Sequence, residues 1–237
     1  LGTPIPQSSG FGSVVENRGD VENKGYEFSV SSANILKDNF TWNTDFNISF
    51  NRNKVIALGR STDPIYSGAS SEGNFTNITR IGEPVGMIIG YVVEGIYQNQ
   101  AEVDQYAAFP GAIPGNLRMR DVNGDGQITP NDDFDVIGNP YPDFTFGMTN
   151  NLTYKAFDLR VMMVGSKGQE MLHATRFYTD NIDGVFNVRK EVADRWRSES
   201  NPGSGLVPTT NGTGRGRVMY RDTHSLFIDK TDYLWIK

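Results

Sequence analysis

Apolar and polar residues alternate strictly between Thr41 and Asn51. Because successive side chains of a β-strand point to opposite sides, a period of two predicts a strand with one apolar and one polar face. The alternation extends over roughly 14 residues, which is long beside the ~5–6 residues usual for strands of soluble proteins. One face carries Trp42, Thr44, Phe46, Ile48 and Phe50, and the other carries Asn43, Asp45, Asn47, Ser49 and Asn51.

The segment before this strand has the same period. Tyr26, Phe28 and Val30 alternate with polar residues, and the alternation continues to Ile35. The polar residues of segment 37–39 then predict a tight turn. The two strands are therefore expected to form a long hairpin.

A second hairpin is predicted further along the chain. Its first strand is the alternating segment 144–149, its turn is expected around 150–155, and its return strand ends at 165–168. A last strand is expected over 225–237. The apolar face of the return strand consists of Phe157, Leu159, Val161 and Met163.

The connections between these strands differ greatly in length. The hairpin turns are short, whereas the excursions over about 57–143 and 169–224 are very long. Outer-membrane barrels combine short periplasmic turns with long external loops, so this asymmetry favours a barrel with both excursions on the external side. The apolar segment Val85–Tyr97 is then expected to form local β-structure in the external region. One helix is expected over Asn187–Arg197, where Val188, Val192 and Trp196 recur at helical spacing.

Composition narrows the classes of protein further. Only 37% of the 237 residues are hydrophobic, 26 are Gly, and no apolar run approaches the ~20 residues of a membrane helix. A membrane β-strand needs only about 9–11 residues, every second one apolar, so a membrane barrel stays open. The net charge of −6 argues against nucleic acid as a partner, and the absence of Cys excludes a disulfide scaffold. About five strands cannot close a barrel, so we expect a longer parent protein.

Residues 121–132, DVNGDGQITPND, have the spacing of an EF-hand calcium loop. Oxygen ligands recur at every second position, and a Gly occupies position 6, where the loop turns sharply. Thr129 can act directly or through water, and Gln127 contributes its backbone carbonyl. The predicted Ca²⁺ ligands are Asp121, Asn123, Asp125, Gln127, Thr129 and Asp132.

The calcium loop departs from the pattern in three ways. Asp132 replaces the usual Glu and has a shorter reach, so Asp133 is a possible substitute. Flanking helices are not predicted, and Pro130 interrupts any helix that would follow the loop. The plain alternative is an Asp- and Gly-rich turn that binds nothing. If Ca²⁺ binds, its expected role is structural, to order a long external loop.

No catalytic constellation is recognised in the sequence. The two histidines, His173 and His224, lie far apart and are expected to be solvated loop residues. Nucleophile-elbow, phosphate-loop and zinc-protease motifs are absent from the 237 residues. We therefore predict that the protein is not an enzyme, and no substrate-binding residue is assigned.

Several phrases resemble the C-terminal part of SusC/RagA-type TonB-linked outer-membrane proteins. They follow the family's order over almost the whole chain, and the phrase at 118–168 is the most specific because it joins the calcium-type loop to NPYPDFTFG. The others are NRGDVENKGYEFSV (17–30), WNTDFNISFNRNKVIAL (42–58), GEPVGMIIGYVVEGIYQN (82–99) and DYLWIK (232–237).

The resemblance implies an all-β fold: an antiparallel transmembrane β-barrel segment, part of a 22-stranded barrel with long extracellular loops. It implies an outer-membrane importer of oligosaccharides or peptides in a Gram-negative cell. The implied partners are a SusD-like surface lipoprotein, outer-membrane lipid, and the TonB complex, which would act through an N-terminal part missing here. The alternative is a soluble secreted β-sandwich that binds glycan and is stabilised by calcium; both apolar faces would then be buried against each other.

Overall fold

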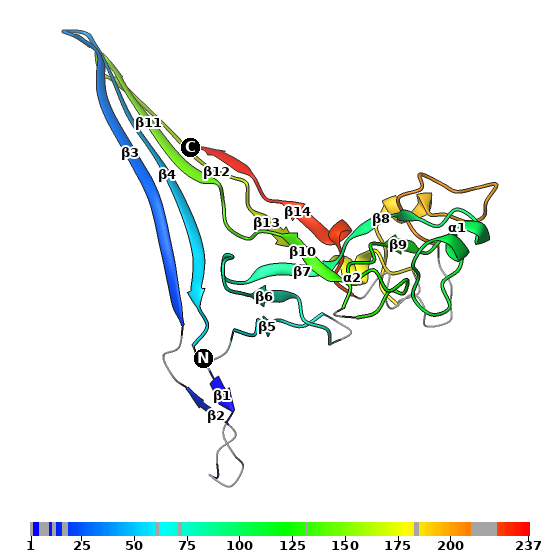
Figure 1. Cartoon of the computed structure of the whole chain (residues 1–237). Helices are drawn as coiled ribbons and strands as arrows, with labels where there is room; N and C mark the ends of the chain where they lie inside the picture. Colours follow the sequence, from blue (N-terminus) through cyan, green and yellow to red (C-terminus); the bar gives the residue numbers. More distant parts are fainter. Residues whose placement is uncertain are drawn as a thin grey trace.

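The computed structural model describes residues 2–4, 10, 13–15, 19–59, 62–70, 73–130, 132–182, 185–209 and 222–237. Its largest element is a five-stranded antiparallel sheet with strand order β15-β12-β11-β4-β3. Figure 1 shows this sheet, called the blade below, as a tall curved layer with a lobe extending sideways from its lower end. The blade comprises β3 (Asp20–Lys37), β4 (Phe40–Ala57), β11 (Phe144–Tyr154), β12 (Phe157–Lys167) and β15 (Tyr233–Ile236).

Both predicted hairpins are confirmed, and their turns lie together at the tip of the blade. The first turn contains only Asp38 and Asn39, between β3 and β4. The second contains Lys155 and Ala156, and Lys155 adopts a left-handed φ of 56°. The backbone N–H of Lys155 donates to the carbonyl of Asn39 at 3.0 Å, which joins the two turns.

The predicted turn at 150–155 is wrong for most of its length. Asn150 to Tyr154 continue β11, paired residue by residue with β4 on one side and β12 on the other. Asn150 and Asn151 are usually turn residues, but here two neighbouring strands satisfy their backbone groups. The side chain of Asn150 also has partners on β4, so the strand extends through it.

The predicted last strand is divided. Ser225–Phe227 form a 3₁₀-helix, Ile228–Lys230 form β14, and only Tyr233–Ile236, β15, join the blade. Asp232, between β14 and β15, accepts a hydrogen bond from the backbone of Gly168 at 2.7 Å. This contact fixes the point where the chain passes from the lobe to the blade.

The lobe is formed by residues 62–138 and 169–230, as far as they are described. Its main sheet has the order β10-β7-β6-β5. The strands of this sheet are β5 (Ile65–Ser67), β6 (Asn77–Thr79), β7 (Met87–Tyr91) and β10 (Phe134–Gly138). Two smaller pairs are β8 (Val93–Ile96) with β9 (Leu117–Met119), and β13 (Glu170–Leu172) with β14. The local β-structure predicted for 85–97 is thus confirmed.

A compact apolar core holds the two excursions together in the lobe. Trp196, from the second excursion, packs with residues of the first. The short helices α1 (Gln100–Gln105) and α2 (Arg176–Thr179) lie around this core. Its buried members are Tyr91, Ile96, Phe109, Leu117, Met119, Ile128 and Trp196.

The predicted helix over 187–197 is mostly wrong. Only Lys190–Asp194 are helical, as one 3₁₀ segment, and Arg189 and Arg195 on either side are extended. Val192 and Trp196 are buried as expected, but Val188 is exposed. The backbone N–H of Arg189 donates to the carbonyl of Thr179 at 2.9 Å and its side chain donates to Asp180, and these contacts hold Arg189 outside the helix.

Within the part of the chain that the structure describes, β1 (Gly2–Pro4) and β2 (Ser13–Val15) form a separate two-stranded sheet. Among the described residues, no helix combines the length and the apolar character that a membrane-spanning helix requires.

Candidate functional site

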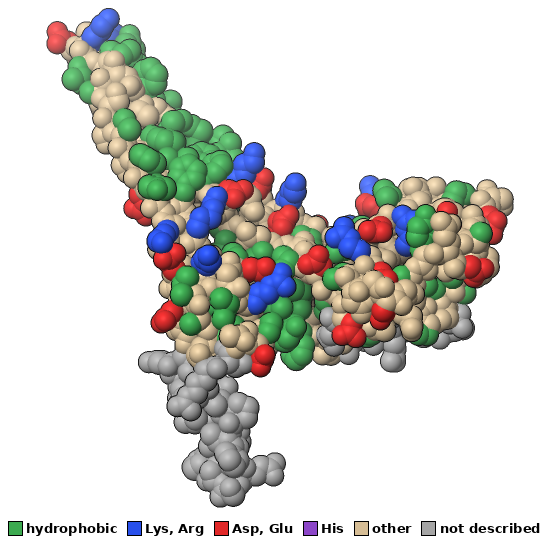
Figure 2. Space-filling view, viewed as in Figure 1, with side chains coloured by type: hydrophobic (Ala, Val, Ile, Leu, Met, Phe, Trp, Pro, Cys, Tyr) green, Lys and Arg blue, Asp and Glu red, His purple; other side chains and the backbone are tan. Residues whose placement is uncertain are grey.

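One face of the blade is apolar and exposed. Directly paired residues of an antiparallel sheet share a face, and the register places Phe28, Ile48 and Phe146 side by side across three strands. Tyr26 is 73% exposed and Phe157 is 77% exposed. Soluble proteins rarely leave an apolar surface this large open to water. In Figure 2 the same face is the green area over the upper part of the blade.

Aromatic residues lie at both ends of this apolar face, as a membrane-type face requires. Near the turns, Phe40 and Tyr154 contact each other edge to face, with ring centroids 6.5 Å apart. At the end nearer the lobe, Phe144 contacts Phe50 at 5.8 Å and Phe146 at 6.3 Å. Outer-membrane barrels carry a girdle of aromatic residues at each membrane–water interface. The two aromatic rows of the blade are placed as two such girdles would be.

The few polar groups on the apolar face bond to one another. Trp42 Nε1 donates to Asn150 Oδ1 at 3.0 Å, and Thr44 Oγ1 donates to the same oxygen at 2.7 Å. Asn34 Nδ2 in turn donates to Thr44 Oγ1 at 2.7 Å. Polar groups without water must find partners within the protein, and this row does so.

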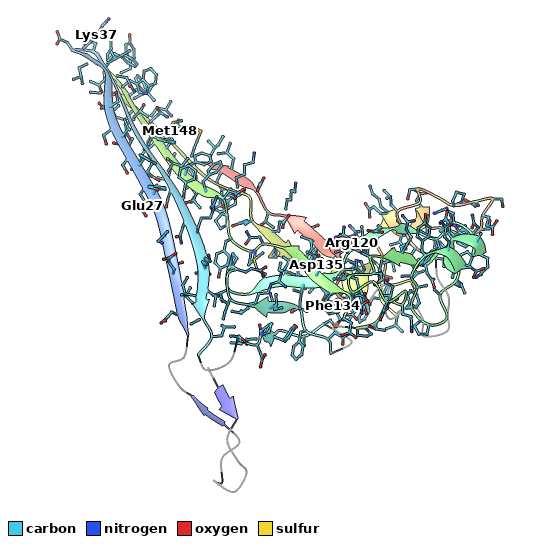
Figure 3. All side chains as sticks on the ribbon, in the orientation of Figure 1. Glu27, Lys37, Arg120, Phe134, Asp135 and Met148 are labelled. Carbon is cyan, nitrogen blue, oxygen red and sulfur yellow. The ribbon has the colours of Figure 1, made fainter. Side chains whose placement is uncertain are left out.

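The opposite face of the blade is mainly polar. Ser31 donates to Asp45 at 2.7 Å, and Thr153 donates to Asp158 at 2.7 Å. Figure 3 labels Glu27 on this face and Met148 on the apolar one. Trp235 and its cross-strand partner Val164 are apolar exceptions that the alternation did not predict.

The soluble sandwich alternative does not agree with this arrangement. It requires a second sheet to cover the apolar face of the blade. In the described part of the chain, the lobe instead contacts β4 away from the apolar face. The side chain of Asn53 accepts from Val85 N at 2.8 Å, and the backbone N–H and carbonyl of Val55 bond with Glu83 and Gly82.

The acidic loop is closed by its own carboxylates. Asp121 accepts from the backbone N–H groups of Gly124 at 2.6 Å and Gly126 at 2.8 Å. Both glycines have a left-handed φ, of 78° and 83°, which L side chains rarely adopt. Asp125 Oδ1 accepts from Gln127 N at 2.8 Å. The sequence spacing thus produces the sharp turn that was predicted.

Asp133 fixes the base of the loop. Its side chain is fully buried, and its two oxygens accept from Val122 N at 3.0 Å and Thr129 N at 2.7 Å. Ile128 is buried in the lobe core next to it. Both oxygens of Asp133 are therefore engaged by the backbone, which favours an anchoring role over that of a substitute ligand.

The predicted ligands are only partly brought together. Asn123 Nδ2 donates to Asp125 Oδ2 at 3.1 Å, and Thr129 Oγ1 donates to Asp132 Oδ2 at 3.2 Å. Gln127 lies within the same exposed loop. Among the described residues, no three acidic or histidine side chains lie close enough to hold a metal ion. The amide, hydroxyl and carbonyl oxygens of the loop are further donors of the hard type that Ca²⁺ takes.

A buried ion cluster in the lobe was missed by sequence reasoning. Asp180 accepts from Arg189 Nε at 2.6 Å and from Arg176 Nε at 2.8 Å. Burial alone raises the pKa of Asp180, but the hydrogen bonds from Arg189 and Arg176 outweigh it and hold the pKa below its ordinary value. The spacing of Arg176 and Asp180 over one helical turn was the available sequence signal.

The histidine prediction holds for one residue only. His173 is about half exposed and its Nδ1 lies 2.7 Å from Asp229 Oδ2. His224 is buried, contrary to prediction, with its ring 3.8 Å from that of Phe227. His224 directly precedes the 3₁₀-helix Ser225–Phe227, in which Phe227 is buried in the lobe. His224 is buried with it because the two rings pack against each other.

Known proteins similar to this chain have names and structures that agree with the observed fold. No family model matches the chain. The chain is 38% identical to TonB-dependent receptor P3 of Formosa agariphila over 81% of its length, and 36% identical to receptor P26 of the same organism over 100%. It is 29% identical to TonB-dependent receptor SusC of Bacteroides thetaiotaomicron over 65%.

The chain is a SusC/RagA-like TonB-dependent receptor segment. It spans 19% of P3 and 23% of P26, about a fifth to a quarter of their length. The solved RagAB peptide transporter superposes with a TM-score of 0.71 at 19% identity, covering 98% of this chain and 24% of that one. RagAB in its open-open state gives 0.75 at 17% identity, covering 99% and 23%. The blade is therefore an antiparallel segment of a TonB-dependent transporter barrel.

Proposed function

We propose that this SusC/RagA-like segment forms part of the wall of an outer-membrane importer. Its apolar face would meet lipid, its polar face would line the interior, and the lobe would lie on the external side. The observation that carries this proposal is the continuous exposed apolar face with an aromatic row at each end. Both edge strands, β3 and β15, lack an outer neighbour within the described chain, which suits a larger sheet.

The cargo and partners are inferred from the relatives. Their names, receptor and peptide transporter, support import over catalysis. The proposed cargo is an oligosaccharide or a peptide, and the name of RagAB supports the peptide. A SusD-like lipoprotein would cap the external side, where the lobe offers a broad surface. Energy for import would come from TonB, which would act on a part of the parent protein outside this chain. The acidic loop at 121–132 would bind Ca²⁺ and order the lobe, without a catalytic role.

Adjacent residues on the two faces give a direct test of the wall. We expect Met148→Arg in the parent protein to lower the stability of the assembled barrel by about 2–4 kcal/mol, because it places a charge in the lipid layer. Thr149→Arg, which faces the interior, should have a much smaller effect. Assembly is measured by heat-modifiable mobility of isolated outer membranes. Equal loss in both variants would contradict the proposed orientation.

The import function is tested separately. Cells that lack the parent gene are expected to lose uptake of either labelled oligosaccharides or labelled peptides. Thr149→Arg should leave the assembled barrel nearly as stable as the wild type, so a loss of uptake in that variant would reflect transport and not the stability of the wall. Unchanged uptake of every oligosaccharide and peptide offered would overturn the importer proposal while leaving the barrel assignment intact.

A further inference from the structure

A band of basic residues borders the apolar face of the blade at the end away from the turns. Lys24 pairs directly with Arg52, and Lys54 pairs with Glu22 on the same two strands. Lys167 pairs with Phe144 on the neighbouring hairpin. Because directly paired residues share a face, these basic side chains project on the side of the exposed aromatic residues. In Figure 2, Lys and Arg atoms gather along the lower border of the green area.

Two shallow grooves combine these cations with aromatic rings. The first, of about 680 Å³, is lined by Asn23, Lys24, Gly25, Tyr26, Phe50 and Arg52. Beside this groove β3 and β4 approach closely at Gly25, where a Cβ would lie 2.2 Å from the carbonyl oxygen of Phe50. The second, of about 320 Å³, has walls from Phe144, Phe146, Lys167 and Leu234. Pairing of a further strand with β3 uses backbone groups in the plane of the sheet, so it leaves side chains on this face accessible.

Carboxylates also face the band, and they do not neutralise it. Glu22 lies 2.7 Å from Lys24, and Asp143 lies 3.2 Å from Arg52. All four side chains are at least 38% exposed, and ion pairs this open to water are weak. Asp232, in the second groove, already accepts a backbone hydrogen bond from Gly168.

The remaining two cations add a net positive charge to the band. Within the described chain, neither Lys54 nor Lys167 has an acidic group within salt-bridge distance. An anion at the height of the aromatic row would therefore meet two uncompensated lysines and two weakly paired cations.

We propose that this band binds the phosphate groups of the outer-leaflet lipid. The inference rests on the proposed membrane orientation and adds a specific ligand to it. Phosphate oxygens accept charge-assisted hydrogen bonds from Lys and Arg. Arg52 already donates from Nη1 and Nη2 to Asp143, so it would contribute its charge and its remaining N–H groups. The aromatic walls of both grooves would hold the apolar part of the same lipid. Charge and apolar character thus meet at one boundary, as a phosphorylated lipid requires.

The test uses the parent protein released from outer membranes in mild detergent. Bound lipid is identified by native mass spectrometry, then exchanged against vesicles of neutral phosphatidylcholine with and without a lipid phosphomonoester. The variant is Lys24→Gln/Arg52→Gln/Lys167→Gln. Its matched control, Lys37→Gln/Lys155→Gln/Arg160→Gln, removes the same charge near the turns and on the polar face.

We expect the band variant to bind the phosphorylated lipid on the order of a hundredfold more weakly, since each basic residue near an anionic surface contributes roughly fivefold. The control should retain wild-type binding, and neither should change binding of the neutral lipid. Equal binding by both variants, or displacement of the lipid by free inorganic phosphate alone, would overturn the proposal.

Assembly into the membrane, measured first for both variants, separates this proposal from the wall itself. A wild-type protein that does not assemble as a barrel overturns the proposed function, whereas an assembled protein without lipid preference overturns only the band. Should the triple variant not assemble, Lys167→Gln alone is expected to weaken binding roughly fivefold. An unchanged affinity in that variant would count against the proposal.

Discussion

At the scale of single residues, the lobe depends on polar groups that have lost their water. Asp180 is 12% exposed and is held between Arg176, at 18%, and Arg189, at 40%. Arg176 also donates to the carbonyl of Leu226, which connects α2 with the segment that leads back to the blade. Removing Asp180 takes the nearest carboxylate from both arginines and, within the described chain, leaves Arg176 with only the longer carboxylate contact to Asp229, at 3.8 Å.

We predict that Asp180→Asn destabilises the lobe at neutral pH by roughly 2–4 kcal/mol, somewhat below a fully buried pair because Arg189 is partly solvated. The folded pKa of Asp180 lies below its unfolded value of about 3.9. Its stabilisation is therefore present above that value and is lost as the pH falls through the depressed folded pKa. The measurement is the hydrogen-exchange protection of the Phe177 amide in the parent protein at neutral and acid pH. We expect lower protection in Asp180→Asn than in the wild type at neutral pH, and a smaller difference between the two at acid pH.

Glu94→Gln provides the matched control for Asp180. Glu94 lies 3.2 Å from Arg120, and the two side chains are 42% and 50% exposed. Water screens an ion pair at this exposure, so we expect a loss of no more than about 1 kcal/mol. A loss in Glu94→Gln as large as in Asp180→Asn would show that burial does not decide the effect.

At the scale of elements, sequence periodicity was sufficient for the blade and insufficient for its ends. The alternation from Trp42 to Phe50 set the face of β4, and direct pairing with β3 and β11 transferred that face to its neighbours. The local sequence predicts a turn at Asn150. Its hydrogen bonds with Thr44 and Trp42 join residues far apart in the chain, so the local pattern cannot show that the strand continues.

The lobe was harder to predict for the same reason. Its short strands and 3₁₀ segments are fixed by contacts between the two excursions, such as Trp196 against the core of the first. The burial of His224 and the ion cluster of Asp180 also depend on residues distant in the chain. The acidic loop was the exception, because its glycines and aspartates bond within a few residues of one another.

The calcium proposal belongs to this element. We expect Ca²⁺ to increase hydrogen-exchange protection over residues 122–129 of the parent protein, with an affinity on the order of 10⁻⁴–10⁻³ M, as in other extracellular loops. Asp121→Asn/Asp125→Asn should abolish the increase because it removes two charged ligands. Asp135→Asn, in β10 next to Arg120 (Figure 3), is the control and should respond like the wild type. No response to millimolar Ca²⁺ in the wild type would refute the site.

At the scale of the whole molecule, the chain combines two parts with different environments, the blade and the lobe, which are joined along β4. The blade turns an apolar face outward and bonds its few polar groups on that face to each other. The lobe has a core of its own and attaches through the other side of β4, at Asn53 and Val55. This division is what a segment of barrel wall with large external loops requires.

The proposed orientation of the blade requires that the even-numbered residues of β3 between Tyr26 and Val30 face lipid. These 237 residues contain no Cys, so native cysteines need replacing only in the rest of the parent protein before single ones are introduced here. We would attach a nitroxide spin label in turn at residues 26–31 of the parent protein in outer membranes. Collision with oxygen, which dissolves in lipid, is then compared with collision with a water-soluble relaxing agent.

We predict that oxygen accessibility alternates with a period of two and is highest at Tyr26, Phe28 and Val30, while accessibility to the water-soluble agent shows the opposite phase. The reversed phase, or equal access of the water-soluble agent to both faces, would contradict the proposed orientation.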